Sequence, residues 1–137
     1  MKLEHFLEVK NLSVSIDGPS GEVQAVRDVS FSLKKGEVLA IVGESGCGKS
    51  VLCKSIMKLL PPSAKIKEGS ISVNGQDITC YREKEMQKLR GRIFSMIFQD
   101  PMTSLNPTIK IGKQIAEAVL IHNKNYTKEQ VSQKVLE

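Results

Sequence analysis

Residues 43 to 50 are the stretch of this sequence whose residue types and spacing could do chemistry. They read GESGCGKS, in which two glycines, a lysine and a hydroxyl follow the pattern G-x-x-x-x-G-K-S. A triphosphate needs many donors and little steric bulk, and glycine lets the backbone wrap closely around it. Lys49 would bring a point charge to the β- and γ-phosphates, and the Ser50 hydroxyl would bind Mg²⁺. A plain glycine turn between a strand and a helix is the alternative interpretation.

The backbone of this loop is expected to bind phosphate as well. The N–H groups of Gly46 to Val51 would form an anion nest at a helix N-terminus, where the helix dipole favours negative charge. Bound ATP and Mg²⁺ would therefore contact Gly43, Glu44, Ser45, Gly46, Cys47, Gly48, Lys49, Ser50 and Val51. Cys47 has two interpretations: a small loop filler, or a reactive thiol that alkylates readily unless Mg-ATP protects it.

The segments on either side of the loop are of the kind that such a motif requires. Residues 38–42 (VLAIV) are apolar throughout, which is typical of a strand buried on both faces of a parallel sheet. After the loop, one helix face is predicted from the spacing of Leu52, Ile56, Leu59 and Leu60. Pro61 and Pro62 should end that helix.

Other segments alternate between apolar and polar residues, as strands of a half-buried antiparallel sheet do. They are residues 7–16, residues 29–34 and residues 68–73, and an Asn74-Gly75 pair after the last of them predicts a hairpin. The third strand could pair with the N-terminal ones. The chain would thus pass from an antiparallel sheet into an α/β core at Glu37.

A second buried strand is predicted at residues 93–98 (IFSMIF), directly before Gln99-Asp100-Pro101. Asp100 could be a carboxylate that organises Mg²⁺, or Gln99 could reach Mg²⁺ or the attacking water. Gln99 is favoured, because no second acid adjoins Asp100. The candidate catalytic residues are then Lys49 and Gln99, and the candidate Mg²⁺ ligands are Ser50 and Gln99.

Helices are predicted in three further segments. Residues 83–90 should turn Met86 and Leu89 inward, and residues 111–122 show apolar helical spacing. Thr127 and Gln130 form a capping-box pair that opens a last helix. His5 and His122 are expected at the surface.

The composition is that of a globular protein rather than a membrane-spanning or nucleic-acid-binding one. Hydrophobic residues make up 40% and charged residues 26% of the 137 residues, and the net charge of +5 is scattered along the chain. No apolar run approaches the roughly 20 residues of a membrane span, and the N-terminus contains acidic residues and no long apolar core, so it is not a secretory signal. Aromatics at 4% without Trp give little support for base stacking on a nucleic acid. The three cysteines, Cys47, Cys53 and Cys80, are expected to be free.

Four stretches together resemble the nucleotide-binding subunits of ABC transporters, nearest to those of oligopeptide, dipeptide or nickel importers. They are LEVKNLSVSI, GEVQAVRDVSFSLKKGE, IVGESGCGKS and SMIFQDPMTSLNP. In that family GESGCGKS is the Walker A motif, and Gln99 corresponds to the Q-loop glutamine. The resemblance implies an α/β fold: a P-loop NTPase (RecA-like) core, an antiparallel β-subdomain and the start of a helical subdomain. The β-subdomain would comprise 1–36 and about 66–80, the core 37–60 and about 82–100, and the helical part 101–137.

The resemblance also implies an activity and a set of partners. The chain would couple ATP binding and hydrolysis to uptake of oligopeptides or dipeptides, with peptide favoured over nickel. Two membrane permease subunits, a second ATP-binding subunit and, indirectly, a solute-binding protein would be its partners, and nucleic acid would not. It would lie at the cytoplasmic face of the membrane, with residues 100–107 near a coupling helix of the permease.

The sequence departs from the family pattern in two respects. The position at which the family usually places an aromatic against adenine is Ile16, and no LSGGQ-type signature, Walker B acid pair or switch histidine is present. The last helix has no stop signal, so we expect a truncated ABC domain that does not turn over ATP by itself. A remnant that only binds nucleotide and a non-transport ABC ATPase remain as alternatives.

Overall fold

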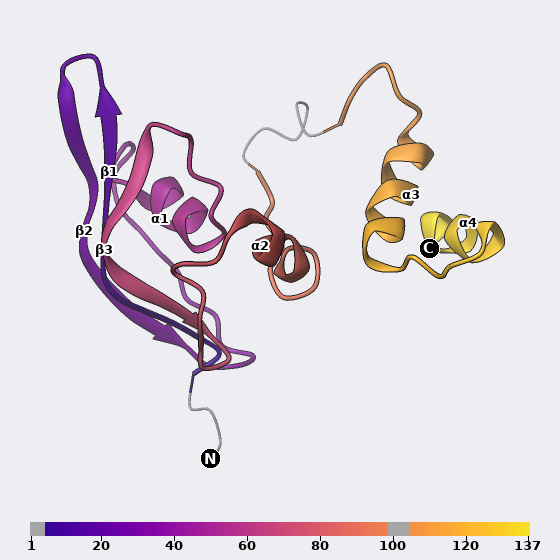
Figure 1. Ribbon diagram of the computed structural model, residues 1–137, viewed down its shortest axis with the longest axis horizontal. Coiled ribbons are helices and arrows are strands. Elements are labelled where there is room, and N and C mark those ends of the chain that lie inside the picture. Colours follow the sequence, from indigo (N-terminus) through magenta and orange to yellow (C-terminus); the bar gives the residue numbers. More distant parts are fainter. Residues whose placement is uncertain (1–4, 99–104) are drawn as a thin grey trace. The chain divides into compact units, whose positions relative to one another are not determined.

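The computed structural model describes residues 5–98 and 105–137. The chain divides into two compact units, Met1–Met86 and Gln87–Glu137. The first unit holds a β-sheet and the helix that follows the glycine-rich loop, and the second holds a pair of helices (Figure 1).

The sheet of the first unit has four antiparallel strands in the order β2-β1-β3-β4. The strands are β1 (Leu7–Gly18), β2 (Gly21–Leu33), β3 (Ala64–Val73) and β4 (Gln76–Asp77). The predicted hairpin is confirmed: Asn74 and Gly75 have φ values of 50° and 76°, as a tight two-residue turn requires. The predicted pairing of the third strand with the first is also confirmed, since Leu7 lies opposite Val73 and Val9 opposite Ile71.

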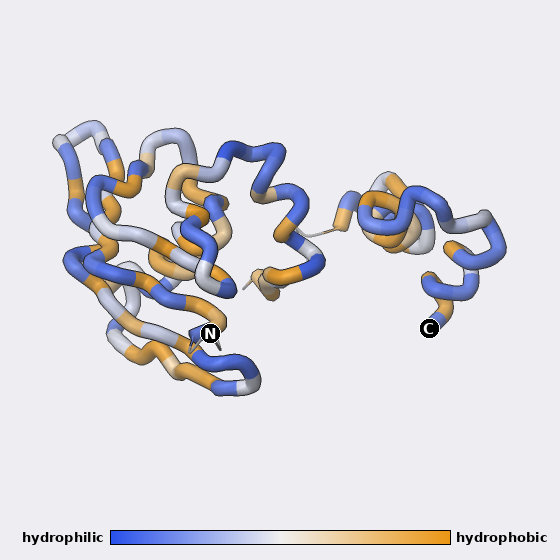
Figure 2. The backbone as a smooth tube through the Cα atoms, turned by 60° about the horizontal axis from the view of Figure 1, so that its bottom comes forward, coloured by the Kyte–Doolittle hydropathy of each residue, from blue (hydrophilic) through white to orange (hydrophobic). Residues whose placement is uncertain are grey.

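Alternation along the strands produces the core of this unit, and hydrophobic and hydrophilic residues alternate along the tube in Figure 2. Helix α1 (Lys49–Ile56) packs against β1 and β2 through Leu52 and Ile56. Each such side chain contributes about 1.5–3 kcal/mol when it leaves water. The buried apolar residues of the sheet are Val9, Leu12, Val14, Val26, Ile71 and Val73.

Helix α1 is shorter than predicted and ends before Leu59 and Leu60. Lys58 lies in the left-handed region at φ 52°, its N–H donates to Ser55 O (3.0 Å), and the N–H of Leu59 donates to Lys54 O (2.8 Å). These two bonds form a Schellman motif, which closes the helix well before Pro61. Leu59 and Leu60 are half-buried outside the helix, so the predicted apolar face is wrong at those two positions.

Neither apolar segment that was predicted as a core strand is a strand in this structure. Residues 38–42 pair with no strand within the described ranges, and Val38 and Val42 are 93% and 89% exposed. In residues 93–98 only Phe94 makes a bridge, to Arg90, and Ile97 is 97% exposed. A parallel strand exists only where neighbouring strands accept and donate its hydrogen bonds, and apolar residues alone do not supply those partners.

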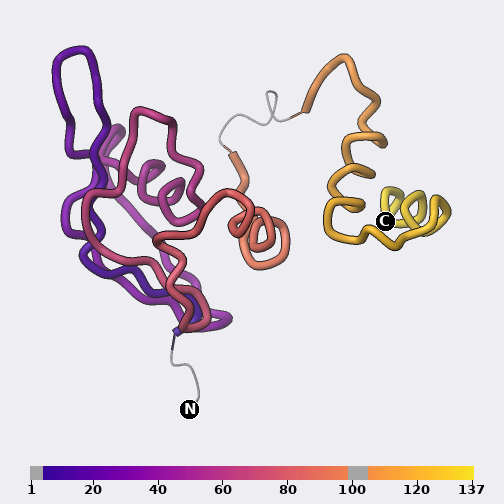
Figure 3. Tube along the Cα trace, viewed as in Figure 1, coloured from indigo at the N-terminus to yellow at the C-terminus, as the bar shows by residue number. Residues whose placement is uncertain are grey.

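The helices after β4 match their predicted positions. Helix α2 (Glu83–Leu89) buries Met86 completely, and α3 (Ile111–His122) is followed by α4 (Lys128–Leu136). Figure 3 traces the chain from α3 through a short turn into α4. The capping box is confirmed, because Thr127 Oγ1 accepts from Gln130 N (3.3 Å) and Gln130 Oε1 accepts from Thr127 N (2.9 Å).

The two helices of the second unit differ in how they bury their apolar residues. Val131 of α4 is buried, whereas Leu136 is 85% exposed, so Val135 rather than Leu136 completes the inward face. α3 buries none of its own residues within the described part of the chain. None of the helices in residues 5–98 and 105–137 has the length and apolar character needed to cross a membrane.

Candidate functional site: a glycine-rich loop at a helix N-terminus

The path of the loop depends on its glycines. Gly46 and Gly48 have φ values of 81° and 96°, in the region that favours glycine, and Gly48 is the N-cap of α1. A Cβ on Gly43 would lie 2.7 Å from Cys47 Sγ, so any other residue there would displace the Cys47 side chain. The loop thus leaves a narrow cradle of backbone, as close contact with phosphate requires.

Lys49 folds back over this cradle. Its ammonium donates to Gly43 O (2.7 Å) and Glu44 O (2.6 Å), and its Nζ lies 3.4 Å from Cys47 Sγ. The carbonyl oxygens of Gly43 and Glu44 therefore keep the Lys49 ammonium at the loop, where its positive charge would attract an anion. This arrangement brings together four of the residues predicted to contact nucleotide, namely Lys49, Gly43, Glu44 and Cys47.

The first turn of α1 has donors that the helix does not use. The first helical bond runs from Leu52 N–H to Gly48 O (2.9 Å), so the N–H groups of residues 49–51 precede it. The first turn contains no acidic residue, and Ser50 is exposed there. An anion at such a helix end gains about 0.3–1 kcal/mol from the dipole in addition to its hydrogen bonds. These residues fit the phosphates of a nucleotide, with Ser50 available to a Mg²⁺ ion.

A contact that sequence reasoning missed joins the loop to the sheet. Val14 lies opposite Val26 and Ser15 opposite Gln24, so Ala25 is an extra residue in β2, a β-bulge. A Cβ on Gly48 would lie 2.1 Å from Ala25 O, so the backbones of loop and bulge meet directly. No sequence pattern marks Ala25, because a bulge depends on the register between two strands.

Ile16, the candidate adenine contact, lies near this junction. It is half-buried in β1 and pairs with Val23 of β2 and Ala64 of β3, which places the three side chains on one face of the sheet. Val23 is 62% exposed and lies two residues, roughly 7 Å, along β2 from Ala25. We call Ile16, Val23 and Ala64 the aliphatic patch.

Ion pairs join the strands around the aliphatic patch. Glu22 and Lys67 approach to 2.6 Å, and Asp17 and Lys65 to 3.3 Å. The hydrogen bond to Lys67 holds the pKa of Glu22 below its usual value and raises that of Lys67. Both pairs are exposed, so they connect β3 with β1 and β2 near the patch but contribute little to stability.

Three of the predicted residues, Gln99, Asp100 and Pro101, lie outside the described residues.

The cysteines and histidines were also predicted from the sequence. Cys47 and Cys80 are exposed and Cys53 is half-buried, and all three are free thiols, as expected. The two histidines, expected at the surface, are half-buried instead: His5 shields its Nδ1 from solvent, and His122 packs its ring against Gly91.

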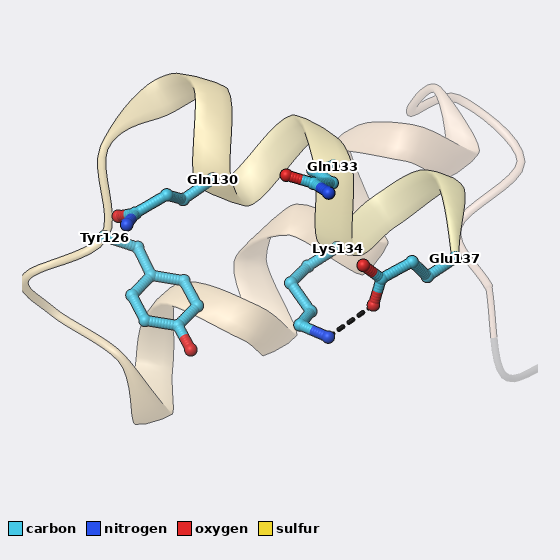
Figure 4. Close-up of a pocket in the computed structure, with 5 residues that line it drawn as sticks. All are labelled: Tyr126, Gln130, Gln133, Lys134 and Glu137. Atoms are coloured by element: carbon cyan, nitrogen blue, oxygen red, sulfur yellow. Dashed lines mark hydrogen bonds and ion pairs between the residues drawn. The ribbon is translucent and has the colours of Figure 1, made fainter.

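A hollow of about 280 Å³ occurs beside α4 and contains no predicted site residue. Its lining residues are Tyr126, Gln130, Gln133, Lys134 and Glu137, and Figure 4 shows Lys134 paired with Glu137. The hydrogen bond that Lys134 donates to the Glu137 carboxylate raises the pKa of Lys134. Because this ion pair is exposed and satisfied within one helix turn, the hollow does not resemble a built ligand site.

Comparison with known proteins agrees with this geometry. Over its whole length the chain is 53% identical to the dipeptide transport ATP-binding protein DppD of Lactococcus lactis, covering 39% of that protein. It is 52% identical to the oligopeptide transport ATP-binding protein OppD of Bacillus subtilis, covering 38% of it. The chain thus spans about two fifths of the length of these curated relatives.

The fold is also that of known structures. The ATP-binding cassette MJ0796, solved as a dimer in a post-hydrolysis state bound to ADP and Pi, matches with a TM-score of 0.78. The match covers 95% of this chain and 54% of the cassette, at 21% identity, and supports the α/β P-loop fold. The family model described as ABC transporter matches residues 26–137. With its glycine-rich loop at the N-terminus of α1, this chain belongs to the ABC transporter family.

Proposed function

We propose that this chain is part of the ATP-binding subunit of an ABC importer that takes up dipeptides or oligopeptides. The observation that carries the proposal is the loop at residues 43–50: its Lys49 ammonium folds back onto Gly43 O and Glu44 O, and the first N–H groups of α1 precede the first helical hydrogen bond. The peptide substrate is inferred from the relatives, a dipeptide and an oligopeptide transport ATP-binding protein that are about half identical to this chain.

In this proposal the loop residues hold the nucleotide and do not break bonds. ATP supplies the phosphoanhydride to be cleaved, and Mg²⁺ neutralises charge on its phosphates. The backbone N–H groups of residues 46–51 orient the phosphates, Lys49 exchanges its carbonyl partners for phosphate oxygens, and Ser50 binds Mg²⁺. Gln99 is proposed to reach Mg²⁺ or position the attacking water.

The base would rest on the aliphatic patch. Without an aromatic ring, Ile16 and Val23 offer dispersion and apolar burial but no stacking. Val23 lies roughly two strand residues from the bulge at Ala25, against which Gly48 of the phosphate-binding loop packs. This spacing suits a ligand whose base rests on the patch and whose phosphates bind to the loop. We therefore expect adenine to add less affinity than the phosphates do.

The proposed partners are those of an importer. Two permease subunits, a second ATP-binding subunit and a solute-binding protein would complete the assembly at the cytoplasmic face of the membrane. A dimer of ATP-binding subunits agrees with the dimeric form of the cassette to which the fold is similar.

Nucleotide titration of the purified chain tests the proposal. Mg-ATP should bind to the wild type, and Lys49→Ala should weaken binding at least about tenfold, since one charge-assisted hydrogen bond contributes about 1.5–3 kcal/mol. We expect the chain alone to release no phosphate, because its sequence lacks an LSGGQ-type motif and a Walker B acid pair. Equal ATP affinity of wild type and Lys49→Ala would contradict the site, and lysine-dependent phosphate release would contradict the expected lack of turnover.

A further inference from the structure

Besides the bulge at Ala25, β1 and β2 each contain one further extra residue, and these two residues are neighbours in the sheet. Three apolar pairs define the register here, namely Val9–Phe31, Leu12–Val29 and Val14–Val26. From the first pair to the second, β1 advances by three residues and β2 by two, and from the second pair to the third the numbers are reversed. The two bulges lie at Asn11 in β1 and Asp28 in β2, and both residues are left-handed, at φ 47°.

The paired bulges keep one face of the sheet apolar. Residues three apart in a regular strand point to opposite faces, yet Val26 and Val29 both lie opposite buried residues of β1. Because each strand contains one of these bulges, the register after them is the same as before. Loss of the bulge at Asp28 alone would shift Ala25 and Val26 by one position against β1 and turn the Val26 side chain to the other face.

Hydrogen bonds join the two bulges. Asn11 Nδ2 donates to Asp28 Oδ1 (2.8 Å), and since a carboxylate can only accept, the carboxamide must turn its N–H groups to it. Asn11 N donates to Ser30 Oγ (2.7 Å), and Asp28 N donates to Ser13 Oγ (3.1 Å). The backbone N–H of each bulged residue is thus bonded to a serine of the neighbouring strand, which leaves the bond between Asn11 and Asp28 to couple the bulges themselves.

β3 holds the bulge of β1 from its other side. A Cβ on Gly69, whose φ is 93°, would lie 2.5 Å from both Lys10 O and Asn11 O. The backbone of β3 therefore touches the bulge at Asn11, so Asn11 has no room to move toward β3. β2, in contrast, is an edge strand of the sheet. If the bond between Asn11 and Asp28 were lost, β2 would be the strand that moves.

Movement of β2 would reach the phosphate-binding loop. Asp28 lies three residues from Ala25, roughly 10 Å along the strand. A Cβ on Gly48 would lie 2.1 Å from Ala25 O and 3.8 Å from Val26 Cγ2, so this part of β2 lies against the N-cap of α1. Figure 1 shows α1 beside β1 and β2, which it contacts.

We propose that Asn11 and Asp28 are positioning residues of the nucleotide site: the hydrogen bond between their side chains couples the two bulges and thereby holds Ala25 O against Gly48, where α1 begins. The inference rests on the proposed function, since the loop must bind the phosphates of ATP. Neither side chain contacts nucleotide in this scheme. Both act through β2, so loss of their bond should loosen the first turn of α1 and weaken phosphate binding.

Exchange of the two side chains is the sharpest test. Asn11→Asp places two carboxylates face to face with no hydrogen between them, so repulsion replaces the bond. Asp28→Asn keeps an oxygen to accept from Asn11 and loses only the charge. The double variant Asn11→Asp/Asp28→Asn restores one carboxylate and one carboxamide, with donor and acceptor exchanged. Asn74→Asp is the matched control, because it makes the same substitution at another left-handed residue of the sheet (φ 50°), in the hairpin between β3 and β4.

Three measurements on the purified chain separate positioning from a purely structural role. They are affinity for Mg-ATP, affinity for inorganic triphosphate, which has no base, and amide hydrogen exchange at Leu52, whose N–H makes the first bond of α1. One lost hydrogen bond shifts an equilibrium about fivefold. We therefore expect Asn11→Asp to weaken both affinities and to speed Leu52 exchange about fivefold, while the other three variants stay within about twofold of the wild type.

Wild-type affinities and exchange in Asn11→Asp would overturn the inference. A double variant as impaired as Asn11→Asp would do the same, because the defect would then come from residue 11 and not from its bond to Asp28. An equal defect in Asn74→Asp would show that any added charge in the sheet has this effect.

Circular dichroism checks that each variant is folded. Should Asn11→Asp unfold, the double variant provides the test: a folded chain with wild-type affinities supports the bond, and an unfolded chain contradicts it. If the wild type binds neither ATP nor triphosphate, the proposed function fails and the inference fails with it. Failure of the inference alone leaves wild-type binding intact, so the two failures are distinguishable.

Discussion

Replacement of Gly48 by Ala should damage this protein more than the same replacement at Gly46, two residues earlier in the same loop. Both glycines have a positive φ, 96° at Gly48 and 81° at Gly46, so alanine is strained at either position. They differ in their surroundings. A Cβ at Gly46 would meet no atom within 4 Å, whereas one at Gly48 would lie 2.1 Å from Ala25 O.

The structure sets the size of the difference. The left-handed conformation costs an alanine about 1–2 kcal/mol, which is the whole effect expected for Gly46→Ala. In Gly48→Ala the loop and β2 must also separate by about 0.9 Å to reach the 3.0 Å that real Cβ contacts respect. Forced overpacking of this kind costs about 1–3 kcal/mol, so we expect a total of about 2–5 kcal/mol.

Urea denaturation of the purified chain, followed by circular dichroism, measures these free energies of unfolding. ATP affinity should also fall further in Gly48→Ala, because the clash displaces the first N–H groups of α1. If the two variants lose the same free energy, the contact between Gly48 and the bulge at Ala25 is not tight, and the account of how the sheet positions the loop is wrong.

Three further outcomes are expected. The exposed thiol of Cys47 should be alkylated readily, and saturating Mg-ATP should slow the reaction severalfold; equal rates by mass spectrometry with and without nucleotide would contradict the site. Thr127→Ala should destabilise α4 by about 1 kcal/mol through loss of the N-cap, measurable as faster amide exchange in α4, while Thr127→Ser should not. Hydrogen bonds from the side chain and N–H of Thr79 hold the pKa of Asp77 below its usual value. That stabilisation is present above the unfolded pKa of about 3.9 and is lost as pH falls through the folded pKa, so Asp77→Asn should flatten the acid limb of a denaturation profile.

Features that depend on neighbours along the chain could be predicted from the sequence. Asn74-Gly75 gives a hairpin because both residues tolerate positive φ, and Thr127 caps α4 because Gln130 lies three residues later. The glycine-rich loop belongs partly to the same class, since Lys49 bonds the carbonyl oxygens of Gly43 and Glu44 within the loop itself. The pairing of the third strand with the first was likewise predicted, because alternating segments must share one buried face.

Features that depend on distant segments could not be predicted in this way. Residues 38–42 have the composition of a buried strand, yet Val38 and Val42 are exposed because no described strand pairs with them. The early end of α1 arises from the left-handed Lys58, a residue type that seldom marks a helix end. The hydrogen bonds that join the Gln114 side chain to the backbone of Asn106 and Ile109 likewise have no sequence signature, since glutamine is common on helix surfaces.

The sequence by itself predicted the phosphate chemistry: the order of glycines, lysine and serine between residues 43 and 50 sets the spacing of the candidate donors, the charge and the candidate metal-binding hydroxyl. Only the tertiary structure decided what surrounds that chemistry. A bulge at Ala25 sets the sheet against Gly48, and strand pairing places Ile16 beside Val23 and Ala64. The reason is physical: local bonding is fixed by residues that are covalently close, whereas close approach of two backbones is fixed by the packing of whole elements.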